Sequence, residues 1–112
     1  MSNTGEITGE KLIREQLLAE PAGRRMDYWV SQRVFDRWPD SLTADMVPDY
    51  STDIAAAWQV VEKLVSSGWG AFGWDGFDHG HRWIVGFGNS RAEAATMPLA
   101  VCRAALLVAT GA

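Results

Sequence analysis

The strongest hydrophobic periodicity lies near the middle of the chain and predicts an α-helix. Ile54, Trp58, Val61 and Leu64 or Val65 recur at the spacing of one helical face. Three alanines between the first two favour helix and allow close approach by another element. We expect this apolar stripe to lie in the core, with Trp58 buried in it. We also expect the rest of the domain to be organised around this helix.

Both ends of this helix are marked by residues that favour a helix boundary. Ser51 or Thr52 can cap the first turn through its hydroxyl, and Asp53 adds negative charge beside the positive end of the helix dipole. Gly68 can adopt the left-handed conformation that ends a helix. The pattern therefore predicts a helix that begins just after Tyr50 and ends before Gly68.

Two helical segments precede this one. Residues 8–20 form a first helix or continue into the next, because the proline that follows is tolerated in a first helical turn. Residues 22–38 carry an apolar stripe of Met26, Val30 and Val34, and a second proline stops the helix. Residues 1–7 are polar and are expected to be flexible, which leaves 8–112 as a single domain.

Beyond Gly68 the pattern changes from helical to alternating. Residues 69–75 and 81–88 are rich in aromatic and β-branched residues and predict a β-hairpin with a loop of about five residues. Residues 91–95 supply a possible third strand. A last helix follows, capped by Thr96 and ended by Gly111. The fold class is therefore α+β, a small antiparallel sheet layered with three to four helices.

Composition excludes several classes of partner. The 112 residues are 47% hydrophobic and 21% charged, with a net charge of -4, and their Lys and Arg residues are scattered. Nucleic acid as a partner needs clustered positive charge, so we expect none. The single cysteine fits a reducing compartment, and no apolar run resembles a signal peptide or a membrane span. We expect a cytoplasmic protein, in a bacterial host, that binds neither membrane nor cofactor.

Two motifs resemble those of a known family, the phage ABA-sandwich domain. One runs from Tyr50 to Trp58, reading Tyr-Ser-Thr-Asp-Ile-Ala-Ala-Ala-Trp, and continues through Val60-Val61-Glu62-Lys63. The other spans residues 95–106, and the helix that holds residues 26–35 matches less closely. The resemblance implies an α-β-α layered fold and a phage or prophage origin. It supplies no catalytic residues, and the link before Tyr50 is longer here than is usual in the family.

Two clusters of polar residues are candidates for ligand chemistry. Asp75, Asp78, His79 and His81 crowd one hairpin loop, where the two imidazoles and an aspartate suit a transition metal; a solvated turn explains the same residues. Tyr50, Ser51 and Thr52 surround a helix N-terminus, where free backbone amides bind phosphate. Simple capping explains Ser51, Thr52 and Asp53 completely, and Asp53 would repel an anion.

The six tryptophans divide by position in the predicted elements. Trp29 and Trp83 are expected in the core or half-buried. Trp38, Trp69 and Trp74 lie at element ends or on the hairpin, where an aromatic can anchor a ligand or partner, and Phe77 at the hairpin tip is the most exposed candidate. Cys102 falls within the apolar pattern of the last helix, which predicts a packed thiol rather than a nucleophile.

Three functions are compatible with these residues. The first is a non-enzymatic phage accessory protein that binds a host protein or sequesters a small nucleotide-like ligand, as a protein counteracting host defence would. Its binding residues would be Tyr50, Ser51, Thr52, Trp38, Trp69, Trp74 and Phe77. The second is a small hydrolytic or metal-assisted enzyme that uses Asp75, Asp78, His79 and His81. The third is a virion or assembly component. Under the first and third, we expect a homo-oligomer.

Overall fold

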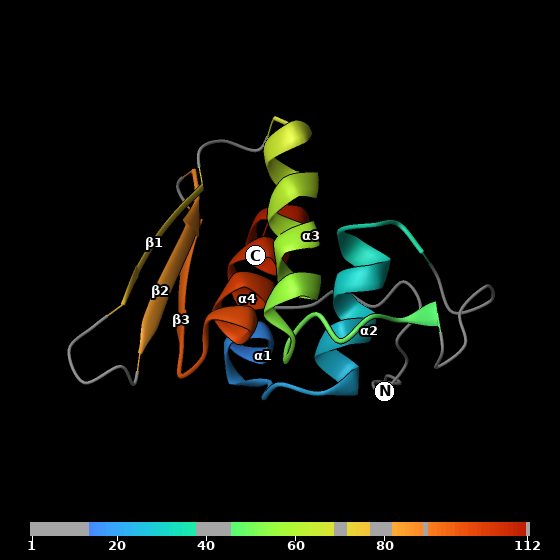
Figure 1. Ribbon diagram of the computed structural model, residues 1–112, viewed down its shortest axis with the longest axis horizontal. Helices are drawn as coiled ribbons and strands as arrows, with labels where there is room; N and C mark the ends of the chain where they lie inside the picture. The colour runs from blue at the N-terminus through green and yellow to red at the C-terminus, as the bar shows by residue number, and fades with distance from the viewer. Residues whose placement is uncertain (1–13, 38–45, 69–71, 77–81, 89, 112) are drawn as a thin grey trace, which may run out of the picture.

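The computed structural model describes residues 14–37, 46–68, 72–76, 82–88 and 90–111 (Figure 1). In chain order its elements are α1 (Arg14–Ala19), α2 (Arg24–Arg33), α3 (Ile54–Ser66), β1 (Phe72–Gly76), β2 (Trp83–Phe87), β3 (Ser90–Ala94) and α4 (Met97–Thr110). The described residues thus contain four helices and three strands, and the predicted α+β class is confirmed. Helix α2 ends earlier than expected, at Arg33, and Asp36 follows with a positive φ of 57°.

The three strands form one antiparallel sheet in the order β1-β2-β3. Trp74 of β1 lies opposite Val85 of β2, and Val85 lies opposite Ala92 of β3. Directly opposed residues share a face, so these three side chains define the inner face of the sheet. The predicted hairpin pairing and the third strand are both confirmed.

Helix α4 is the central element of the domain. It packs over β2 and β3 on one side and against α1, α2 and α3 on the other. Figure 1 shows the sheet at one side of the molecule and all four described helices on the same side of it. Residues 99–107 of α4 are buried with the exception of Arg103, which is intermediate. A helix that is apolar on nearly every side must be enclosed, and this explains why α4, rather than α3 as expected, is the centre.

The boundaries of α3 and α4 follow their capping residues. The N-cap of α3 is Asp53, whose carboxylate accepts the backbone N–H of Ala55 at 3.1 Å, so the expectation of a Ser51 or Thr52 cap is wrong. Gly68 has the positive φ expected after the end of α3. Helix α4 is capped by Thr96, whose hydroxyl accepts the N–H of Leu99, and by Gly111 in the left-handed conformation after its last turn.

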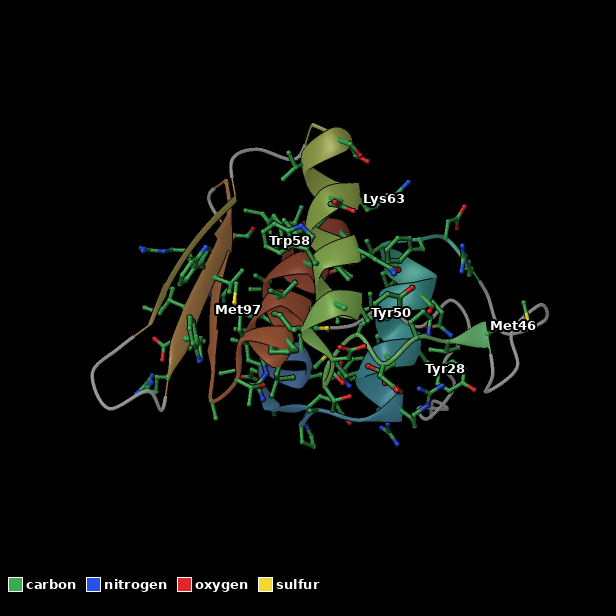
Figure 2. All side chains as sticks on the ribbon, in the orientation of Figure 1. Tyr28, Met46, Tyr50, Trp58, Lys63 and Met97 are labelled. Carbon is green, nitrogen blue, oxygen red and sulfur yellow. The ribbon has the colours of Figure 1, made fainter. Side chains whose placement is uncertain are left out.

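The buried face of α3 differs from the predicted stripe. Its buried residues are Ala56, Ala57, Val60, Val61 and Leu64, and α3 packs against α4. The prediction that Trp58 belongs to the core is wrong. Trp58 is 44% exposed, and Ile54 and Val65, on the same flank of the helix, are 49% and 47% exposed. In Figure 2 Trp58 projects from α3 toward the side of the sheet, whereas Lys63 points the other way.

Candidate interaction surface and buried polar clamp

A buried carboxylate joins two segments that are distant in sequence. Asp27 of α2 is 1% exposed, and its Oδ1 accepts the backbone N–H of Ser51 at 2.8 Å and the Ser51 hydroxyl at 2.7 Å. The Ser51 Oγ in turn accepts the backbone N–H of Gly23, just before α2, at 2.9 Å. Asp27, Ser51 and Gly23 therefore form a clamp that fixes the chain before α3 against the first turn of α2.

An arginine extends this clamp to the surface. Arg24 donates to Asp27 at 3.3 Å, to the carboxylate of Asp49 at 2.8 Å and to the carbonyl of Val47 at 3.1 Å. Its guanidinium also lies 5.7 Å from the ring centre of Tyr28, within the range of a cation–π contact. Arg24 thus neutralises part of the charge on Asp27 and binds the segment before Ser51 at two points.

The chemistry of Asp27 is that of a structural group. Burial raises the pKa of its carboxyl above the ordinary value, while the two hydrogen bonds from Ser51 and the positive charge of Arg24 act in the opposite direction. Its donors, the backbone N–H and hydroxyl of Ser51 and the guanidinium of Arg24, come from both sides of the junction between α2 and the segment before α3. The group therefore serves to hold α2 and the Tyr50–Ser51 segment together.

The predicted ligand-binding residues at the start of α3 have interior positions. Tyr50 is 1% exposed and its ring stacks on Phe35 with 5.3 Å between ring centres; Ser51 is fully buried in the clamp. Burial also raises the pKa of the Tyr50 hydroxyl. Thr52 is exposed. Trp38, Trp69 and Phe77 lie outside the described residues. Of the predicted residues at the start of α3, Tyr50 and Ser51 are therefore interior and Thr52 is at the surface.

A second feature is an apolar surface on α3, which we call the α3 flank: Ile54, Trp58 and Val65. These residues lie within about 40° of arc around the helix and extend over about 16 Å along it. Their neighbours on the outward side of α3 include Gln59, Glu62 and Lys63, all exposed and polar or charged. The flank is thus a compact apolar strip beside a hydrophilic face.

Trp74, one of the three tryptophans that the sequence assigned to a contact surface, is exposed. It lies on the inner face of the sheet, where 56% of its surface is accessible, although the side chain opposite it, Val85, is fully buried. The reason is that α4 covers β2 and β3 more extensively than β1. Trp74 contacts Trp83 with 5.5 Å between ring centres. Trp83 is half-buried and Trp29 is buried, as predicted.

The residues proposed for metal or nucleophilic chemistry have different outcomes. Asp78, His79 and His81 lie outside the described residues, and Asp75 is placed by its backbone within β1. Within the described ranges no three His, Cys, Asp or Glu side chains gather as a metal site would require. Cys102 is fully buried, and burial raises the pKa of its thiol far above the ordinary value. The prediction of a packed thiol is confirmed.

Sequence reasoning missed the clamp and the outward position of Trp58. Asp27 offered a signal, because it lies directly beside Met26 of the apolar stripe of α2, and an acid that is buried there needs a donor. The periodicity of α3 gave no such signal for Trp58. A stripe of large apolar residues is the same pattern whether the protein itself or a partner covers it.

The fold and clamp define a small α+β domain in which an antiparallel three-stranded sheet lies against a buried central helix. The sequence profile of the phage ABA sandwich domain matches residues 10–106, and the chain belongs to that family. The two motifs that suggested this resemblance form the clamp and α3, and the central helix α4. No helix in the described part of the chain has the length and apolarity to cross a membrane.

A solved structure supports the same fold. A phage protein from Bacillus cereus ATCC 14579, with a crystal structure at 2.0 Å, superposes on this chain with a TM-score of 0.55. The two share 20% sequence identity, and the match covers 94% of each chain. At that identity the likeness concerns the fold alone. The curated protein sequences contain no match to the chain.

Proposed function

We propose that this phage protein acts without catalysis, by binding a bacterial host protein in the cytoplasm through the α3 flank. The observation that carries the proposal is the exposure of Trp58 between Ile54 and Val65 on one side of a well-packed helix. Tryptophan is enriched among the residues that dominate binding energy at protein interfaces. A role against host defence would be one use of such binding.

The size of the α3 flank suits the centre of a protein contact. A tryptophan that is 44% exposed offers about 110 Å², taking about 250 Å² for the whole side chain. Covering that area contributes about 3 kcal/mol at about 25 cal/mol per Å². Ile54 and Val65 extend the same strip in both directions, and the polar side chains beside it provide the rim that interfaces of this kind usually have.

The contacts at the start of α3 favour a protein over a nucleotide-like ligand. The hydroxyl of Ser51 is buried and bonded to Asp27, and the Tyr50 ring is stacked against Phe35. The carboxylate of Asp53 already accepts an N–H at the helix N-terminus, and its charge opposes phosphate. An aliphatic and aromatic strip supplies the apolar contacts that a protein surface can meet.

The decisive experiment compares two substitutions on one helix. Trp58→Lys removes the apolar centre of the α3 flank, and Gln59→Lys adds the same charge on the hydrophilic face next to it. Tagged wild-type protein and both variants are used to recover partners from infected host cells, and the recovered protein is then purified and titrated calorimetrically. We expect Trp58→Lys to weaken its affinity at least 10-fold and Gln59→Lys to weaken it less than 3-fold.

Two results would refute this function. One is a partner whose affinity is equal for wild type and Trp58→Lys, which would place the contact elsewhere. The other is that phage infection is impaired when the protein carries His79→Ala and His81→Ala together but not when it carries Trp58→Lys. That result would favour the metal-assisted enzyme. Recovery of the protein in purified virions, with host binding absent, would favour the assembly role.

A further inference from the structure

The two edges of the sheet are treated differently by the rest of the domain. At β3, Arg103 of α4 donates one N–H to the Glu93 carbonyl at 2.9 Å and another to the Glu20 carbonyl after α1 at 3.0 Å. Strand β3 also carries Arg91 and Glu93, and charged side chains on an edge strand discourage pairing with another strand. This edge is thus tied to the helical layer and protected.

No such tie to the helical layer is observed for β1 among the described residues, and this strand carries one charged residue, Asp75, where β3 carries two. It pairs with β2 along one side, and no described strand pairs with its other side. Its sequence, Phe-Gly-Trp-Asp-Gly, contains no lysine or proline. Glycine at position 73 lets a second backbone approach closely, and space around its Cβ position is open. An unprotected edge of this kind is a template for strand addition.

The exposed Trp74 identifies what the added strand must bring. It lies in the middle of β1, on the inner face, beyond the cover that α4 gives to β2 and β3. A partner strand that only supplied backbone hydrogen bonds would leave this side chain exposed. A partner strand with an apolar residue opposite Trp74 would bury it.

We propose that β1 pairs antiparallel with β1 of a second copy of this chain, with Trp74 opposite its own counterpart. The two-fold axis then passes beside Trp74, and the two sheets join into one of six strands. Each copy supplies the apolar residue that the other's Trp74 requires, which an isologous interface achieves with a single exposed side chain. In this register Asp75 lies opposite Gly73 of the second copy, not opposite its own counterpart.

This pairing is independent of the proposed host contact, because it uses β1 and leaves α3 free. The dimer would present two α3 flanks, one from each copy. A host partner with two binding positions would then be held by both. Loss of the dimer and loss of host binding are therefore separable results.

The first test is the mass in solution. Sedimentation equilibrium of the full chain at about 10–200 µM is expected to give twice the 12.3 kDa chain mass. Trp74→Lys places two like charges across the axis and is expected to weaken the dimer at least 10-fold. The matched control, Trp58→Lys, removes the second exposed tryptophan of the described residues and adds the same charge, and is expected to leave the dimer unchanged. Far-UV circular dichroism verifies that both variants are folded.

The second test maps the axis with a single added cysteine. Residues directly opposite on paired strands have Cβ atoms about 4.5–5.5 Å apart, close enough to oxidise to a disulfide after a small adjustment. Trp74→Cys is expected to form a disulfide-linked dimer under mild oxidation. Thr52→Cys, at an exposed position that is distant from β1 in the sequence, is expected to form none. The native Cys102 is buried and does not compete. A monomer at about 200 µM, a dimer insensitive to Trp74→Lys, or equal cross-linking through Thr52→Cys would each overturn the proposal.

Discussion

The clamp around Asp27 leads to the sharpest prediction for stability. In Asp27→Ala the backbone N–H and the hydroxyl of Ser51 both lose their acceptor while buried. Each buried polar group left without a partner costs about 1–3 kcal/mol. The hydroxyl can still reach the Gly23 carbonyl, 3.3 Å away, so the loss is nearer to one full penalty than to two. We expect Asp27→Ala to lower the free energy of unfolding by about 2–3 kcal/mol.

Asp27→Asn separates the hydrogen bonds from the charge. The amide oxygen of asparagine can accept both bonds from Ser51, and the cost of burying a carboxylate disappears. Arg24 loses one partner in this variant but keeps Asp49 and the Val47 carbonyl. At neutral pH we expect Asp27→Asn to be at least as stable as wild type, and so well above Asp27→Ala.

The pH dependence follows from the direction of the pKa shift. Burial raises the pKa of Asp27 in the folded protein above its ordinary 3.8. The folded state therefore holds this proton more tightly than the unfolded state does. The stabilisation from that tighter binding is complete below pH 3.8 and is lost as pH rises through the higher folded value. Across that window wild type should lose stability relative to Asp27→Asn, and the difference should then level off.

Urea unfolding followed by tryptophan fluorescence measures all three proteins between pH 3.5 and about 8, with the linear dependence on urea giving each free energy. The exposed Asp53→Asn is the matched control for removal of one negative charge. The reasoning fails if Asp27→Asn is as unstable as Asp27→Ala at neutral pH. It also fails if wild type gains stability relative to Asp27→Asn as pH rises through the window.

Three further predictions concern the core. Gln32 is buried with no hydrogen-bond partner for either amide atom among the described residues. Gln32→Leu should therefore raise the free energy of unfolding, measured in urea, by about 1 kcal/mol. A lower free energy than that of wild type would mean that the amide has a partner in solution. Trp29→Ala should cost about 3–5 kcal/mol and Trp58→Ala less than half as much in the same assay, because only Trp29 is enclosed; equal costs would contradict the outward position of Trp58. The thiol of Cys102 should resist a thiol reagent in the folded protein and react fully in denaturing urea, and rapid reaction without denaturant would show that α4 opens readily.

The elements of this fold were largely readable because their boundaries are local. Thr96 and Gly111 mark the ends of α4 through contacts with residues only a few positions away. The alternation that predicted β2 is equally local, and both β2 and the possible third strand formed close to where the sequence placed them. Such signals survive any tertiary arrangement that keeps the element.

The clamp was less readable because its partners are far apart in the chain. Ser51 and Asp27 are 24 residues apart, and nothing in the local sequence says that Ser51 turns toward α2 rather than capping α3. Both uses place a hydroxyl before a helix. The choice depends on whether a buried carboxylate stands within reach, which is a tertiary fact. The adjacent Asp53 was available to take the capping role.

The error over Trp58 has a physical cause that also bears on function. Helix α3 carries more apolar surface than its neighbours cover: the face with Val60 and Leu64 is buried, and the flank beside it stays exposed. Periodicity measures the whole apolar face and cannot divide it between core and contact surface. The α3 flank is the part of this apolar face that the domain leaves exposed. The residue that sequence reasoning misplaced is therefore the one on which the proposed host contact depends, and Trp58→Lys tests both statements at once: little loss of fold stability, and a large loss of binding.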